Sequence, residues 1–164
     1  MQKMSPYSEK LFEGQEYYRQ IEYVESPELK DRVYFDDYGL IHLSHDSRLG
    51  ERAEKEQLER LELLHEAKEI LQGKIPSQCE KQYRDIPVIL QRRGNGSKGN
   101  YWIFKAYINN HRTTVVVREG PRKDGSCKYF WSVFQSPLSK PKKRAIAPWL
   151  TQKIRRRTAL AYAR

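Results

Sequence analysis

Three runs of alternating apolar and polar residues constrain the fold of this chain more than any other feature. They cover residues 101–108, 112–118 and 128–135. A period of two places alternate side chains on opposite faces of a β-strand, and Asn109-Asn110 between the first two runs suits a tight turn, because Asn accepts left-handed backbone. The runs therefore predict an antiparallel meander. The predicted core face carries Trp102, Phe104, Ala106, Ile108, Thr113, Val115, Val117, Phe130, Ser132 and Phe134.

A helical period precedes these strands. Between residues 51 and 72, leucine and other apolar residues recur at steps of three and four, which is the spacing of an amphipathic helix. Glu56 stands four residues before Arg60, an order that favours a helix. Gly73 and Pro76 follow as stop signals. We therefore expect an α+β fold in which a small antiparallel β-sheet packs against one long helix.

The other segments give weaker patterns. Residues 7–20 are expected to form a helix. Two β-prone runs, 32–35 and 40–44, flank Asp36-Asp37-Tyr38-Gly39, which indicates a β-hairpin because glycine accepts positive φ at a turn. We expect a short edge strand at 87–90 and a mobile, glycine-rich loop at 91–100.

The chain divides into three parts by composition. Residues 1–30 form an acidic, partly helical N-terminal segment, residues 31–136 form the α+β core domain, and residues 137–164 form a basic C-terminal tail. Within the tail, a helix is expected from about residue 148 to 162, with Pro148 at its first position.

Charge is distributed very unevenly along the sequence. Residues 1–72 hold 10 Lys and Arg against 17 Asp and Glu, a net charge of −7, whereas residues 73–164 hold 21 against 4, a net charge of +17. A one-sided basic surface indicates a polyanionic partner. A solvated surface with a fortuitous skew is the alternative. Nucleic acid is favoured, and RNA over DNA.

Basic and aromatic side chains of this half are the candidate nucleic-acid contacts. Lysine and arginine that neutralise phosphates release condensed counterions, and aromatic rings can stack on unpaired bases. Tyr101, Tyr107 and Tyr129 are further candidates for stacking, unless they cover a second core. The predicted binding residues are Arg112, Arg122, Lys123, Lys128, Trp131, Lys142, Lys143, Arg144, Lys153, Arg155, Arg156 and Arg157.

Other classes of protein fit less well. The sequence has no run of 18 apolar residues and no basic amphipathic helix with a lipid-facing stripe, so we expect no membrane partner. Two cysteines, Cys79 and Cys127, without a CxxC motif argue against structural zinc and favour a cytoplasmic compartment. Carboxylates are sparse in the basic half, which disfavours a two-metal nuclease. We expect no metal and no cofactor.

Two histidines are candidates for proton transfer. On the expected strand, His42 points away from Ile41 and Leu43, and an imidazole with a pKa near 6.5 can accept or donate a proton at neutral pH. His45 lies in Ser44-His45-Asp46, whose side chains can instead hydrogen-bond to backbone. A purely structural role is the alternative for each.

The order of these parts resembles a group of toxin nucleases. A histidine beside a serine, a helix, an Ile-Pro turn and a sheet that ends in Trp-Ser-Val-Phe-Gln-Ser (131–136) are similar to the barnase–EndoU–colicin–RelE-like (BECR) ribonuclease fold, over about residues 32–136. The resemblance implies RNA cleavage without a metal, by attack of the 2′-hydroxyl. His42 or His45 would be the general base or acid, Arg118 would stabilise the phosphate, and Ser132 would supply the hydroxyl of the last strand. Residues 1–30 and 137–164 depart from the pattern.

Three functions therefore stay open. The first is a non-catalytic, accessory or regulatory RNA-binding protein that binds through a basic sheet face and its tail. The second is the metal-independent ribonuclease. The third is a protein-interaction module whose basic tail binds an acidic partner. The acidic segment could also compete with RNA for the basic face, in which case deleting residues 1–30 would tighten binding.

Overall fold

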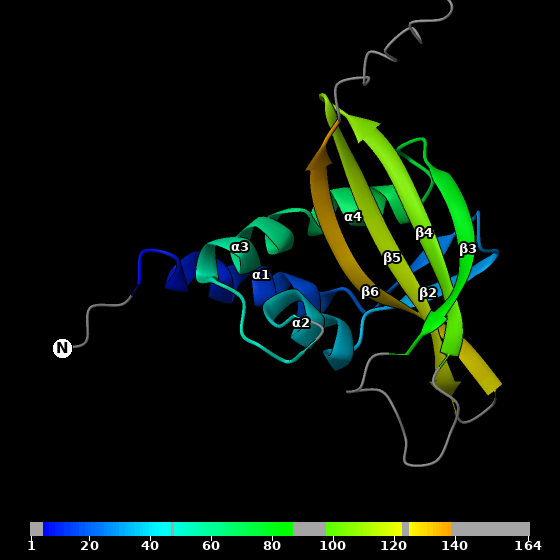
Figure 1. The fold of residues 1–164 in the computed structure, drawn as a ribbon, viewed down its shortest axis with the longest axis horizontal. Coiled ribbons are helices and arrows are strands. Elements are labelled where there is room, and N and C mark those ends of the chain that lie inside the picture. Colours follow the sequence, from blue (N-terminus) through cyan, green and yellow to red (C-terminus); the bar gives the residue numbers. More distant parts are fainter. Residues whose placement is uncertain (1–4, 47, 87–97, 123–124, 139–164) are drawn as a thin grey trace, which may run out of the picture.

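The computed structural model describes residues 5–46, 48–86, 98–122 and 125–138. Figure 1 shows a curved sheet with the helices gathered on one side of it. This is an α+β arrangement, as the sequence predicts. The elements are α1 (Ser8–Gln20), β1 (Tyr23–Ser26), β2 (Asp31–Tyr34), α2 (Asp37–Ser44), α3 (Glu54–Glu62), α4 (Leu64–Leu71), β3 (Gln78–Asp85), β4 (Lys98–Ile108), β5 (His111–Arg122) and β6 (Gly125–Pro137).

The sheet has six strands in the order β1-β2-β6-β5-β4-β3. The meander of β4, β5 and β6 is confirmed, and its first turn has Asn109 and Asn110 at positive φ, 47° and 63°. The sheet is mixed, because β2 pairs with β6 in parallel at Val33 and Tyr34 only. The other neighbours are antiparallel.

The main core lies between the helices and one face of the meander. Phe104, Ala106, Val115 and Val117 are almost fully buried on this face, as the alternation of β4 and β5 predicts. Leu64, Ala67, Ile70 and Leu71 of α4 cover them with side chains at most 1% exposed.

The predicted face of the third strand is wrong beyond Phe130. A β-bulge shifts the register, so that Val117 pairs with Phe130 but Val116 pairs with Ser132. The extra residue moves the following side chains by one position, because one inserted residue reverses the alternation of a strand. Phe130 and Val133 therefore face the helices, whereas Ser132 and Phe134 belong to the opposite face, which we call the open face.

The predicted hairpin over 32–44 is also wrong after Tyr34. The chain leaves β2 and forms α2, because the Asp36 carboxylate accepts a hydrogen bond from the backbone N–H of Gly39 at 3.0 Å and caps the helix. Gly39 does not have positive φ. It is needed for close packing: a Cβ there would lie 2.7 Å from the carbonyl oxygen of Phe130 and would also collide with the Tyr18 hydroxyl.

This close packing gives a stability prediction. We expect Gly39→Ala to lower the free energy of unfolding by about 2 kcal/mol or more, because the added methyl meets backbone that cannot move aside cheaply. The melting temperature should fall by roughly 5 °C or more in thermal unfolding. Gly50→Ala is the control, since its Cβ would approach only the exposed Asp46 side chain, at 3.1 Å. Equal effects of the two substitutions would contradict this account.

The expected long helix is two helices. Leu63, with φ −80° and ψ −5°, separates α3 from α4. The break lets α3 pack on α1 and β6 while α4 lies over β5 and β1. The leucine pattern does not reveal it, because both halves present apolar side chains to the same core.

The N-terminal helix is confirmed as α1, and it belongs to the main core. Leu11, Tyr18, Ile21 and Val24 are buried there. Deleting residues 1–30 would therefore remove core side chains, and the loss of packing would obscure any relief of competition with RNA.

Two strands were not predicted from the sequence, namely β1 and β3. Residues 98–100, expected in a loop, begin β4 and pair with β3. The expected strand at 87–90, most of the loop at 91–100 and the helix at 148–162 lie outside the described residues.

Candidate functional site

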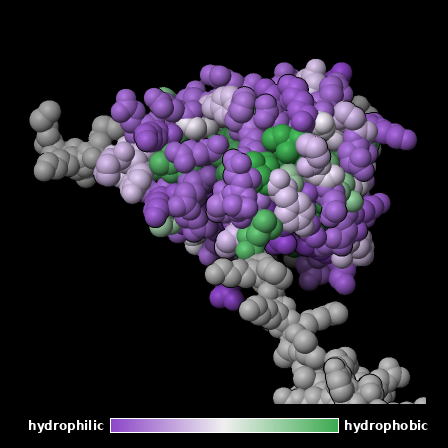
Figure 2. Space-filling model, turned by 90° about the horizontal axis from the view of Figure 1, so that it is seen from above, coloured by the Kyte–Doolittle hydropathy of each residue, from purple (hydrophilic) through white to green (hydrophobic). Residues whose placement is uncertain are grey.

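A small apolar cluster occupies the middle of the open face. Tyr101, Ile103, Val116 and Trp131 are at most 7% exposed, and Phe134 packs against them. Tyr101 and Trp131 are thus buried in a second apolar cluster, which was the alternative to base stacking. Tyr107, on the same face, is 57% exposed. Figure 2, which shows the molecule from above the view of Figure 1, shows that hydrophilic residues predominate on that side and that hydrophobic ones form small patches.

A cavity of about 250 Å³ opens beside this cluster, where the chain between α2 and α3 approaches β6. Among the described residues that line it, three are arginines and one is a histidine, whereas Asp85 supplies the one carboxylate. We call it the cationic pocket. Its lining residues are His42, Arg52, Arg60, Arg84, Asp85, Tyr101, Val116, Trp131, Ser132 and Phe134.

His42 contributes the imidazole ring of the cationic pocket. Its imidazole stacks on the Trp131 indole with ring centroids 4.2 Å apart and an interplanar angle of 18°. Burial lowers the pKa of His42 to about 4, and the positive charges of Arg52 and Arg60 act in the same direction. The imidazole is therefore neutral at pH 7.

Arg52 and Arg60 supply most of the positive charge. Their side chains are only 13% and 16% exposed. Arg60 Nη1 donates to the Ser132 hydroxyl at 3.0 Å, which ties α3 to β6. One oxygen of Glu56 accepts from Arg52 Nη1 at 2.7 Å and lies 3.3 Å from Arg60 Nη2. One carboxylate thus offsets two guanidinium groups, and the pair keeps a net positive charge.

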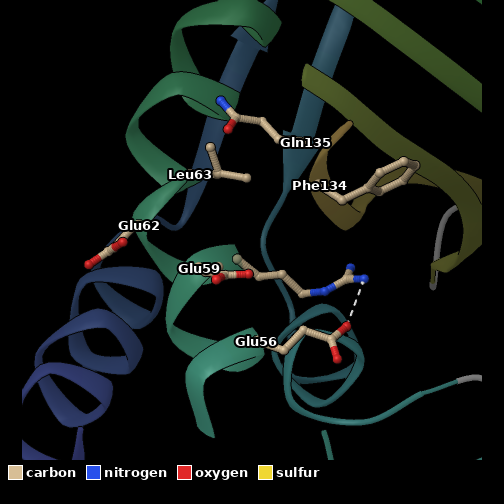
Figure 3. A pocket seen from close by; sticks show the side chains of 7 residues that line it. Glu56, Glu59, Glu62, Leu63, Phe134 and Gln135 are labelled. Atoms are coloured by element: carbon tan, nitrogen blue, oxygen red, sulfur yellow. Dashed lines mark hydrogen bonds and ion pairs between the residues drawn. The ribbon is translucent and has the colours of Figure 1, made fainter. Parts of the chain in front are cut away.

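A second, acidic hollow lies on the other side of Arg60. It has a volume of about 330 Å³ and is lined by Glu56, Glu59 and Glu62 together with Leu63, Phe134 and Gln135. Figure 3 shows this hollow, and its dashed line is the ion pair between Glu56 and Arg60. Arg60 therefore stands at a boundary between acidic and basic surface, which favours an anion on the open-face side only.

Arg118 lies close to the cationic pocket but is not part of its lining. It forms an ion pair with Asp36, and its side chain is only 5% exposed. Its guanidinium carbon lies 4.6 Å from the ring centroid of Tyr129 and 5.6 Å from that of Trp131. These contacts link the beginning of α2 to β5 and β6, and they place Arg118 close to the Trp131 ring, on which His42 stacks.

The remaining predicted site residues are spread over the molecule. His45 Nδ1 contacts the Ser44 hydroxyl at 3.0 Å and the Ile41 carbonyl at 3.3 Å, and His45 does not line the cationic pocket. Lys128 pairs with Asp31 at 2.8 Å and lies over the Trp102 ring. Arg112 lies on the open face, further along β5. The side chains of Arg122, Lys123, Lys142, Lys143, Arg144, Lys153, Arg155, Arg156 and Arg157 lie outside the described residues.

The cationic pocket therefore brings together His42, Trp131 and Ser132 of the predicted set and adds Arg52, Arg60 and Arg84, which the sequence analysis missed. Arg60 was recognised only as the partner of Glu56 on a helix surface. That ion pair exists, but the same guanidinium also reaches Ser132 across to the sheet. Its low exposure depends on tertiary packing, which helix periodicity does not show.

The low pKa of His42 predicts a pH dependence of stability. The unfolded chain takes up a proton near pH 6.5, whereas the folded chain does so only near pH 4, so stability falls as the pH drops through this window. Between pH 7 and pH 5 we expect about 1–2 kcal/mol of loss from this group. Urea unfolding of the wild type and of His42→Phe at both pH values measures it, because the carboxylates titrate in both proteins. An equal loss in the two would contradict the prediction.

Within the described part of the chain, no group of three or more His, Cys, Asp or Glu side chains could hold a metal ion, and no helix is long and apolar enough to cross a membrane. Comparison with protein-family models, with curated proteins and with solved structures found no match to this chain.

Proposed function

We propose that this protein binds RNA, with one phosphodiester of the RNA in the cationic pocket. The observation that carries the proposal is the pair of largely buried guanidinium groups, Arg52 and Arg60, that share a single carboxylate beside Ser132 and His42. Arginine binds phosphate oxygens through two parallel N–H donors, and such charge-assisted hydrogen bonds are strong. A phosphate in the pocket would balance the uncompensated charge.

Single-stranded RNA suits the surroundings of the pocket. The pocket is concave and small, and the exposed ring of Tyr107 lies on the same face of the sheet. Proteins that bind single strands pair a positive surface with aromatic rings that stack on unpaired bases. The net charge of +17 on residues 73–164 would add long-range attraction for any polyanion.

Titration of labelled single-stranded RNA at several salt concentrations tests the proposal. We expect the logarithm of the affinity to fall linearly with the logarithm of the salt concentration, with a slope of about −0.7 for each phosphate neutralised. Duplex DNA and polyglutamate are the competitors. Binding of polyglutamate as tight as that of RNA would favour a protein-interaction module, and no binding of RNA in dilute salt would overturn the proposal.

Metal-independent cleavage of the bound RNA is the second candidate function. It is favoured by the neutral His42 imidazole, which shares the pocket with the two arginines. In this reaction His42 takes the proton of the 2′-hydroxyl, and the 2′-oxygen attacks the adjacent phosphorus. The bond from phosphorus to the 5′-oxygen breaks, that oxygen takes a proton from water, and a 2′,3′-cyclic phosphate remains. The hydroxide left by the water takes the proton from His42, which returns the imidazole to its neutral form. Arg52 and Arg60 would stabilise the extra negative charge on the phosphate oxygens.

A further inference from the structure

Arg112 and Ser136 form a second polar pair on the open face. They are directly opposite each other on β5 and β6, on the same side of the sheet as Ser132 and Phe134. Arg112 Nε and the Ser136 hydroxyl are shut off from solvent and have no hydrogen-bond partner within the described residues. Arg52, Arg60 and Arg118 are each held by a carboxylate, but no ion pair of Arg112 is found in this part of the chain.

An exposed aromatic ring adjoins this pair. Tyr107 is directly opposite Arg112 on β4, and its side chain is 57% exposed. A guanidinium group, a hydroxyl and a tyrosine ring are thus neighbours across three adjacent strands. Together they offer donors for a phosphate and a flat surface on which a base can stack.

The spacing along β6 relates this cluster to the cationic pocket. Ser132 and Ser136 are four residues apart on one strand, which corresponds to about 13 Å. Phe134 lies between them on the same face, with its ring centroid 5.9 Å from the guanidinium carbon of Arg60. More than one nucleotide of an extended strand is needed to cover this distance, so the two clusters would contact different phosphates of one RNA.

We infer that Arg112, Ser136 and Tyr107 form a second subsite that holds a phosphate and a base of extended single-stranded RNA whose first phosphate occupies the cationic pocket. This inference rests on the proposed function. The bound strand runs along β6 across Phe134. Arg112 as a whole is only partly buried, and no carboxylate pairs with it within the described residues, so the accessible part of its guanidinium group can bind a phosphate beside Ser136. The site takes a single strand, because a base stacked on Tyr107 has to be unpaired.

The test compares short and long ligands that cannot be cleaved by 2′-hydroxyl attack. The probes are a 2′-O-methyl dinucleoside monophosphate, which has one phosphodiester, and a 2′-O-methyl hexanucleotide. We expect Arg112→Ala to weaken binding of the hexanucleotide by about tenfold and to leave binding of the short ligand unchanged within about twofold. Tyr107→Ala should act on the hexanucleotide in the same way. Arg112→Lys should restore most of the affinity, because it keeps the charge.

Matched controls separate this inference from the proposed function. Arg19→Ala removes one exposed positive charge from α1, and Phe12→Ala removes an exposed aromatic ring from the same helix. Neither should affect either ligand, whereas Arg60→Ala should weaken both. If Arg112→Ala leaves the hexanucleotide unaffected while Arg60→Ala weakens it, the second subsite is wrong and the pocket stands. The subsite is also wrong if Arg112→Ala weakens both ligands equally. If the wild type binds neither, the proposed function fails, and this inference fails with it.

Discussion

The double substitution R52A/R60A is expected to weaken binding of single-stranded RNA by at least about 100-fold, because a hydrogen bond to a charged group contributes roughly 1.5–3 kcal/mol and two such contacts are lost. The salt dependence should change as well. The plot of log affinity against log salt concentration should become shallower. The magnitude of its slope should fall by about 0.7 if both arginines bind the same phosphate and by about 1.4 if they bind two. Fluorescence anisotropy over a range of salt concentrations measures both quantities.

The control for this prediction is R19A/R32A, which removes the same charge. Both arginines are half exposed and paired with a glutamate, Arg19 with Glu16 and Arg32 with Glu25. The pocket variant should keep its fold, since Glu56 is 45% exposed and can be hydrated once its partners are gone. Thermal unfolding checks this. If both double variants lose affinity equally, net charge governs binding and the cationic pocket has no special role.

The strands β4, β5 and β6 show how far alternation in the sequence predicts which side chains face the helices. Alternation in β4 and β5 identifies correctly the side chains that face the helices, because the two strands pair without a register shift along β4, but it does not show that Tyr101, Ile103 and Val116 are buried on the open face. In β6 the same reasoning is right at Phe130 and wrong at Ser132, since the bulge beside Val116 reverses the alternation. The position of a bulge depends on the side chains that pack around both strands, so the alternation of one strand does not predict it. Here the extra residue is Trp131, whose ring lies against His42.

Gly39 shows a different limit. Asp-Asp-Tyr-Gly has the composition of a turn, and the sequence analysis took the glycine as a sign of positive φ. The helix α2 contains it because Tyr18 and the Phe130 backbone approach too closely for a side chain. Both contacts come from distant segments of the chain, so no local pattern distinguishes this reason from a turn.

The candidate site was predicted only in part, because it too depends on contacts between distant segments of the chain. His42, Trp131 and Ser132 were selected by residue type, and the structure brings them together in one pocket. The expected strand would have placed His42 through its alternation, whereas α2 places it by packing on β6. Arg118 was selected for its charge, but a carboxylate and aromatic rings enclose it. Whether an arginine is available to a ligand depends on its partners, which the sequence alone does not reveal.

The largest effect is expected for His42. If the protein cleaves RNA, His42→Ala and His42→Phe should each lower the rate constant for cleavage by about 10²–10⁴-fold in EDTA, which is the usual contribution of a general base. His42→Phe keeps a flat ring for Trp131 but has no basic nitrogen. Its binding of uncleavable 2′-O-methyl RNA should therefore stay within a few-fold of wild type. The cyclic phosphate ends of the product identify the reaction.

Proton linkage gives this prediction a second readout that does not depend on turnover. Burial is the main cause of the low pKa of His42, and the charges of Arg52 and Arg60 add to it. A phosphate beside the two arginines offsets this second contribution, so we expect the pKa of His42 to rise in the complex. RNA binding then takes up a proton, and affinity should increase as the pH falls from 7 to 5 in the wild type but not in His42→Phe. His65→Ala is the control for histidine loss, since His65 is 75% exposed on α4. If His45→Ala abolishes cleavage while His42→Phe does not, the base has been assigned to the wrong histidine; if purified wild type leaves RNA intact, the protein only binds it.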